Sequence, residues 1–207
     1  MQEMSYAEAR PMMETGDSLL WKSNGLIGRV ISRFCRGVSH VGFVYEQDGI
    51  MLTLESTTMN HKLPDFYSKT PKSGMQCVSL SSKIAQYIAD GGEVWWRHLE
   101  MERTPEFYRD FNTFRLKTSG VPYERNWIEW AASALRFFAP FSEDRSAMFC
   151  SEAKAAGSYD TGILRLDAAA RRPSNSYSPG DWVPPDTLPL GREAKLGPMV
   201  RLTLPIR

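Results

Sequence analysis

The sequence lacks a long apolar run. No stretch of about 18 apolar residues occurs, so the sequence predicts no transmembrane segment. The N-terminal residues 1–15 carry Glu3, Glu8 and Glu14 without an apolar stretch, which is unlike a secretory signal peptide. The cytoplasm is therefore the expected location, with delivery to a cell wall by a virion or a secretion system as the alternative.

An excess of charge of one sign is also missing. Lysine and arginine total 25 and aspartate and glutamate total 24, which gives a net charge of +1. A nucleic-acid-binding protein shows a clustered basic surface, so nucleic acid is not an expected partner. Hydrophobic residues make up 42% and charged residues 24% of the chain, which is ordinary for a globular domain and excludes a disordered chain.

Cysteine and histidine are scarce, with three residues of each kind. An odd number of cysteines without a C-x-x-C pair argues against a disulfide framework or a zinc knuckle and favours reduced thiols. Closely spaced histidines, an H-E-x-x-H motif and a Gly-rich phosphate loop are all absent. We therefore expect no metal and no cofactor.

Short apolar runs separated by turn signals predict most of the strands. Asp48-Gly49 between two such runs is typical of a hairpin turn. The last 37 residues hold seven of the 13 prolines and predict a loop-rich segment with one late strand. The predicted strands span residues 17–21, 41–45, 50–54, 76–80, 93–98 and 199–204.

Helical periodicity appears early once and then dominates the second half of the chain. The apolar residues of 26–35 recur at i, i+3 and i+4, which indicates an amphipathic helix with Arg29, Arg33 and Arg36 on its solvent side. Thr104-Pro105 is a helix start, with Thr104 as the N-cap. The further predicted helices span 83–89, 104–117, 126–138 and 147–156, the last closed by Gly157.

This order of elements predicts an α+β fold. Strands come first and helices later, without βαβ alternation, so we expect an antiparallel sheet of about five or six strands packed against helices. The length fits a single domain over 1–207, with a core at about 15–160 and a Pro-rich C-terminal segment at 161–207.

Cys150 is a candidate nucleophile. It lies at the predicted start of a helix, where the positive end of the helix dipole lowers the pKa of a thiol. A small buried core residue at a helix start is the competing interpretation, since free cysteine is among the most buried residue types.

His40 and Glu55 are candidates for its partners. His40 begins one strand of the predicted hairpin and Glu55 ends the other, so their side chains should lie side by side, as base and orienting carboxylate do in a catalytic triad. A structural histidine and a solvated glutamate are the alternatives. His61, in a polar segment, is a weaker competitor for the orienting role.

Several short motifs together resemble the permuted branch of the NlpC-type papain-like superfamily, which includes YiiX-like proteins and the lecithin retinol acyltransferase-like enzymes. They are Gly16-Asp17 before an apolar strand, Ser39-His40-Val41-Gly42, Glu55, and a late Phe149-Cys150-Ser151-Glu152. In that branch the histidine strand precedes the cysteine helix, as here. The resemblance covers about 15–157 and implies a circularly permuted papain-like fold.

The resemblance also implies roles for individual residues. Cys150 matches the nucleophile, His40 the base and Glu55 the third polar residue. Gly120-Val121-Pro122-Tyr123 resembles a segment whose tyrosine assists the oxyanion, so Tyr123 inherits that role. The aromatic-rich insert 126–141 departs from the unpermuted pattern and could be a substrate wall, a membrane-surface or partner patch, or core; aromatic residues at helical spacing favour core.

The leading hypothesis is therefore a cysteine hydrolase that cleaves an amide bond, in a peptide or in peptidoglycan, through a thioester acyl-enzyme. Ester or thioester hydrolysis, or acyl transfer on lipid-like substrates, is the first alternative. A non-catalytic binding scaffold is the second. Cys35 and Cys77 have no matched partners and are expected to be structural.

Overall fold

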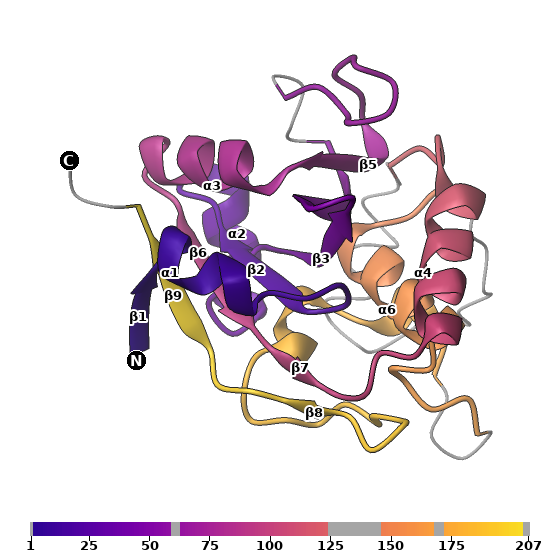
Figure 1. Ribbon diagram of the computed structural model, residues 1–207. Coiled ribbons are helices and arrows are strands. Elements are labelled where there is room, and N and C mark those ends of the chain that lie inside the picture. The colour runs from indigo at the N-terminus through magenta and orange to yellow at the C-terminus, as the bar shows by residue number, and fades with distance from the viewer. Residues whose placement is uncertain (1, 59–62, 124–145, 168–171, 205–207) are drawn as a thin grey trace.

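A computed structural model of the chain describes residues 2–58, 63–123, 146–167 and 172–204. Within them a seven-stranded sheet runs in the order β1-β9-β6-β2-β3-β4-β5, and β7 pairs with β8 in a separate ribbon (Figure 1). The strands of the main sheet are β1 (Gln2–Ser5), β2 (Ser18–Lys22), β3 (His40–Gln47), β4 (Ile50–Thr57), β5 (Gly74–Ser79), β6 (Glu93–Arg97) and β9 (Val200–Thr203). The ribbon consists of β7 (Leu99–Glu100) and β8 (Lys195–Leu196).

The α+β class is as predicted, but the sheet is larger than the expected five or six strands and is not wholly antiparallel. β1 pairs in parallel with β9, whereas the other neighbours in the main sheet are antiparallel. β1 was not predicted because its four residues are exposed or half-buried and carry no apolar alternation. Pairing with a distant strand, a tertiary contact, makes this segment a strand.

The helices cover both faces of the sheet. They are α1 (Tyr6–Ala9), α2 (Leu26–Phe34), α3 (Leu80–Ala89), α4 (Pro105–Thr118) and α6 (Cys150–Asp160), with 3-10 turns at Arg10–Met12, Ser174–Ser176 and Pro179–Trp182. α4 starts as predicted, because the Thr104 side chain accepts a hydrogen bond from the Phe107 N–H at 3.3 Å. The helix predicted at 126–138 lies outside the described residues.

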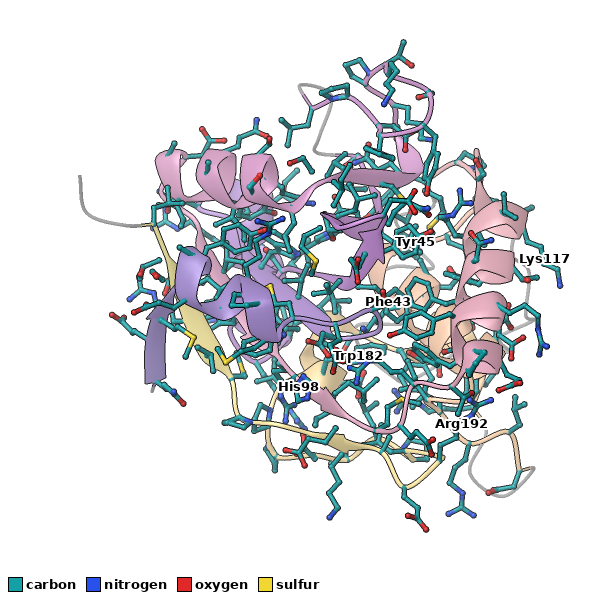
Figure 2. The ribbon with its side chains drawn as sticks, in the orientation of Figure 1. Phe43, Tyr45, His98, Lys117, Trp182 and Arg192 are labelled. Carbon is teal, nitrogen blue, oxygen red and sulfur yellow. The ribbon has the colours of Figure 1, made fainter. Side chains whose placement is uncertain are left out.

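One face of the sheet packs against α4 and α6. Phe43 and Tyr45 of β3 point toward α4 (Figure 2), where the ring centroids of Phe43 and Phe111 are 5.1 Å apart in an edge-to-face arrangement. The opposite face packs against α1 and α3, with Trp21 and Ile84 in its core. Side chains that alternate along β3 and β4 thus face two different helical layers.

Gly157 does not end α6 as the sequence predicted. The helix begins at Cys150, continues through Gly157 and ends at Asp160. A Cβ atom on Gly157 would lie 2.7 Å from the Phe114 ring and 2.8 Å from the Phe43 ring. The glycine therefore permits close packing of α6 on the sheet and on α4.

The orientation of α2 also differs from what its amphipathic pattern predicts. Its buried side consists of the small residues Gly28 and Ser32, followed by Cys35 at the C-cap. The apolar side, which an amphipathic helix normally buries, is exposed instead: Leu26 is 79% and Phe34 61% exposed. Small side chains permit a close approach to the protein, so the larger apolar ones point outward.

Candidate active site

The β3–β4 hairpin brings His40 next to Glu55. Asp48 and Gly49 have φ values of 51° and 78°, as expected for the two central residues of a type I′ turn. The register pairs Phe43 with Leu54, so the start of β3 lies beside the end of β4. The imidazole Nε2 of His40 lies 2.6 Å from Oε2 of Glu55, and both side chains are buried.

Gly42 leaves room for this contact. A Cβ atom at this position would lie 3.2 Å from Cβ of Glu55 and 3.1 Å from the Thr53 hydroxyl. A glycine inside a strand often marks the close approach of another backbone. The structure shows that the neighbouring strand makes this approach and that it carries Glu55.

Cys150 reaches the same place from the other half of the chain. It is the first residue of α6, and a hydrogen bond of 2.7 Å from the Ser56 hydroxyl to the Met148 carbonyl ties the preceding segment to β4. Its thiol lies within electrostatic reach of His40 and of the backbone N–H groups of Val41 and Ser151, all of which favour the thiolate. The sulfur, the imidazole and the carboxylate therefore converge on one place.

These contacts determine the protonation states. Burial raises the pKa of Cys150, but the His40 charge, the His40 hydrogen bond and the two N–H donors outweigh it and lower the pKa below the ordinary value. Burial lowers the pKa of His40, but Cys150 and Glu55 outweigh it and raise the pKa to about 9. Both shifts favour the thiolate–imidazolium form of the pair.

The other two cysteines differ in this respect. Burial raises the pKa of Cys35 to about 11 and that of Cys77 to about 12. All three cysteines are free and buried, so burial alone does not distinguish them. The partner histidine and the first turn of a helix distinguish Cys150.

Lys83 is the site residue that the sequence analysis missed. Its ammonium group forms an ion pair with Oε1 of Glu55 and lies 4.8 Å from the centroid of the Trp21 ring. Burial raises the pKa of Glu55, but Lys83 first and His40 second outweigh it and lower the pKa to about 2. Glu55 is therefore a carboxylate held between an ammonium group and an imidazolium.

A sequence signal for Lys83 exists. α3 begins at Leu80 rather than at the predicted residue 83, because the Ser79 side chain caps it by accepting from the Ser82 N–H. Leu80, Lys83 and Ile84 then follow the i, i+3, i+4 spacing of the buried side of α3. A lysine on an apolar helix face requires a buried partner.

Tyr123 lies beside Cys150. Its ring packs edge to face against the ring of Phe149, with centroids 5.7 Å apart. Burial, the Cys150 charge and the nearby Tyr87 raise the pKa of Tyr123 above its ordinary value. The phenol stays protonated and can donate a hydrogen bond. The competing candidate His61 and the aromatic insert 126–141 lie outside the described residues.

Glu152 and Asp17, which belong to the motifs noted in the sequence, have structural contacts. The Glu152 carboxylate accepts a hydrogen bond from the Phe149 N–H at 3.3 Å and so caps α6. The Asp17 carboxylate accepts from Trp96 Nε1 at 2.7 Å and pairs with Arg103 at 2.8 Å. Lys154 of α6 donates to the backbone carbonyls of residues 16 and 17, which ties the cysteine helix to this buried acid.

The donor set does not fit a metal ion. Both oxygens of Glu55 are engaged, one by Lys83 and the other by His40. Among the residues that the structure describes, no group of three or more histidine, cysteine, aspartate or glutamate side chains could hold a metal. In the same residues, no helix has both the length and the apolar composition needed to cross a membrane.

Comparisons with known proteins give a similarity of fold. No protein-family model matches the chain, and no curated protein is similar to it in sequence. Among solved structures it is similar to the crystal structure of the metalloprotein YiiX from Escherichia coli O157:H7. The two chains are 15% identical, with a TM-score of 0.52 over 94% of this chain and 99% of the other.

This similarity defines the class of fold. The chain has a YiiX-like α+β fold, and the superposition extends over nearly the whole length of both proteins. At 15% identity it carries no information on the reaction, and the description of YiiX as a metalloprotein applies to that protein.

Proposed function

We propose that this protein is a cysteine hydrolase of the permuted papain-like type. The observation that carries the proposal is the chain of buried contacts from the Cys150 thiol through His40 to Glu55. Two unrelated residues separated by 110 positions in the chain seldom lie close enough to shift each other's pKa. A nucleophile, a base and an orienting group in mutual contact are the arrangement that covalent catalysis requires.

In the first half of the proposed reaction the Cys150 thiolate attacks a substrate carbonyl carbon and forms a C–S bond. The carbonyl oxygen takes up the negative charge, and the Tyr123 hydroxyl with the backbone N–H of Cys150 stabilises it. The first N–H groups of a helix have no partner within the helix, so they are available as donors. The imidazolium of His40 then gives its proton to the leaving amine as the C–N bond breaks.

The second half releases the acyl group. Neutral His40 takes a proton from a water molecule, and the water oxygen attacks the thioester carbonyl. The C–S bond breaks, the acid is released and the thiolate–imidazolium pair is restored. Glu55 remains ionised throughout, since its pKa of about 2 lies far below that of the imidazole, and it stabilises the imidazolium and its orientation.

An amide bond in a peptide or in peptidoglycan is the proposed substrate. A preformed imidazolium supplies the proton that an amine leaving group needs, which an ester does not require to the same degree. Esters, thioesters and acyl transfer to a second acceptor remain the alternative within the same mechanism.

The test is acyl-enzyme trapping on a panel of amide, ester and thioester substrates, read by intact mass and by peptide mapping. We expect an adduct on Cys150 alone, and turnover that survives treatment with EDTA. His40→Ala should abolish turnover, whereas Glu55→Gln should weaken it less, because the orienting group does not itself move the proton.

The outcome that contradicts the proposal is equally specific. A folded protein that forms no adduct with any of the substrates, and whose Cys150 alkylates no faster in the parent than in His40→Ala, would be a binding scaffold. Loss of turnover in EDTA that added metal restores would instead indicate metal-dependent chemistry.

A further inference from the structure

The exposed side of α2 is an apolar surface without a partner in the described part of the chain. It is a row along one side of the helix, and the residues of this row are between 48% and 79% exposed. All of these residues are among the large apolar side chains that are exposed in the described part of the chain. The apolar row consists of Leu26, Ile27, Val30 and Phe34.

A basic row runs beside it. At 100° per residue, Arg29 and Arg33 project from the helix on the flank of the apolar row, and both are exposed. Within the residues described, no acidic side chain forms an ion pair with either arginine. A third arginine, Arg36, donates from its guanidinium to the backbone carbonyls of Val183 and Pro185, at 3.1 Å each, and anchors the end of α2.

The anchored side of α2 explains why the apolar row cannot turn inward. Gly28 is buried so closely that a Cβ atom would lie 2.5 Å from Cβ of Ser23. On the same side the backbone of Cys35 lies against Gly180. A Cβ atom added to Gly180 would lie 2.9 Å from the carbonyl carbon of Cys35. Rotation of the helix would push large side chains into these contacts, so the apolar row is held outward.

We propose that this face of α2 is a docking surface for an anionic lipid bilayer. A helix that carries large apolar side chains beside arginines is the pattern of a segment lying in a membrane interface. The apolar row enters the boundary between headgroups and acyl chains, and the arginines meet the anionic headgroups. The surface has the required charge complementarity without any rearrangement of the fold.

Size and charge favour a bilayer over a protein. A helix of nine residues is about 13 Å long, whereas a stable protein interface buries about 1,600 Å². Two copies meeting through the same face would bring their arginines together without an acid on that face to pair them. An anionic bilayer requires neither a large buried area nor acidic side chains on α2.

Docking would also place the site beside the membrane. Ser23, just before α2, donates its backbone N–H to the hydroxyl of Ser39, the residue before His40, at 2.9 Å. The segment after Cys35 leads directly to His40. The docking proposal concerns binding and does not depend on the hydrolase proposal.

The test is sedimentation of the full-length protein with vesicles of phosphatidylcholine alone and of phosphatidylcholine mixed with phosphatidylglycerol. We expect binding to the anionic vesicles that weakens as salt is raised. The double variant Leu26→Gln/Phe34→Gln should lower the partition coefficient about tenfold or more. The double variant Arg29→Gln/Arg33→Gln should lower it about fivefold per arginine on anionic vesicles only.

Leu116→Gln provides the matched control. Leu116 lies on α4 and is 58% exposed, close to the value for Phe34, but it has no apolar row around it. We expect this variant to bind like the parent. Circular dichroism verifies that each variant is folded.

Three results would overturn the proposal. The first is a parent protein that sediments with neither kind of vesicle, and the second is equal binding by all variants. The third is a concentration-dependent dimer in sedimentation velocity that Leu26→Gln/Phe34→Gln abolishes, which would make α2 an interface between copies. None of these measurements depends on catalytic activity, so a result against membrane docking does not bear on the hydrolase proposal.

Discussion

The protonation states of individual residues distinguish Cys150 from the other thiols. Cys35, Cys77 and Cys150 are all buried, yet burial dominates the pKa only where no cation compensates it. His40 and the N–H donors of α6 compensate at Cys150, and no comparable set faces Cys77, which lies within β5. Reactivity therefore follows from the neighbours of a thiol rather than from its depth.

Alkylation of Cys150 should accordingly show an unusual pH dependence. We expect iodoacetamide to modify Cys150 before Cys35 and Cys77, at a rate that rises less steeply with pH below about 9 than that of an ordinary thiol, because the lowered pKa favours the thiolate. His40→Ala should restore the steep rise with pH of an ordinary thiol. Site-resolved mass spectrometry measures both; faster labelling of Cys35 or Cys77 in folded protein would contradict the assignment.

Lys83 should act on the site through Glu55. In Lys83→Met the Glu55 carboxylate loses the cation that lowers its pKa most, so burial raises that pKa and the carboxylate stabilises the imidazolium of His40 less. The upper limit of the thiolate–imidazolium range, set by the His40 pKa of about 9, should then fall by about one pH unit or more. The measurement is the pH profile of Cys150 alkylation.

Lys154→Met is the matched control for this variant. Lys154 is also a buried lysine, but it donates to the backbone carbonyls of residues 16 and 17 rather than to Glu55. We expect lower stability without a shift of the pH profile. A profile that shifts equally in both variants would mean that Lys83 stabilises the fold without positioning Glu55.

At the scale of elements, α6 shows how the packing of one helix positions the nucleophile. The helix contacts β3 and α4 through Gly157, where two phenylalanine rings occupy the space of a side chain. The first turn of the same helix carries Cys150, whereas Glu55 pairs with Lys83 of α3 on the other face of the sheet. The cysteine lies near the histidine because α6 begins beside the start of β3.

Gly157→Ala tests this packing. An alanine in a helix interior normally stabilises by about 1 kcal/mol relative to glycine. Here overpacking against Phe43 and Phe114 costs about 1–3 kcal/mol, so we expect a net loss of stability in urea unfolding. Thr113→Ala, at an exposed position of α4, should change stability little. A Gly157→Ala variant more stable than the parent would show that the rings move aside.

The whole molecule joins distant parts of the chain through pairs of buried charges. Lys83 of α3 pairs with Glu55 of β4, and Arg103 pairs with Asp17 at the start of β2. At the sheet edge, β1 near the N-terminus pairs with β9 near the C-terminus (Figure 1). The folded state therefore includes buried ion pairs between residues that are far apart in the chain.

Acid should remove the contribution of Glu55 to stability. The pKa of Glu55 falls from an ordinary 4.5 to about 2 on folding, so the unfolded chain binds more protons between these values. The stabilisation is complete above about pH 4.5 and is lost as the pH falls toward 2.

The comparison with Glu55→Gln isolates this effect. Neutral glutamine resembles the protonated acid, so the difference in unfolding free energy between the parent and the variant should shrink from pH 5 toward about pH 2. Urea unfolding at a series of pH values measures it. A difference that stays constant across this range would mean that Glu55 is not ionised in the folded protein.

The sequence alone was sufficient where local chemistry decides structure. The Asp48-Gly49 turn requires positive φ values that these residues tolerate, and it joins two apolar runs into a hairpin. That hairpin brings the two ends with His40 and Glu55 together, since strands of one hairpin have a single register. Thr104 and Pro105 begin α4 for a similarly local reason, since the threonine caps the helix and the proline occupies its first position.

Tertiary contacts decided the rest, because they depend on residues that are far apart in the chain. β1 is a strand only beside β9, and Gly157 lies inside a helix because two aromatic rings from other elements need its space. Lys83 belongs to the site because its side of α3 faces Glu55. The apolar row of α2 is exposed because the small residues of this helix pack against the rest of the protein. Periodicity shows that a helix has two faces, but only the packing determines which of them is buried.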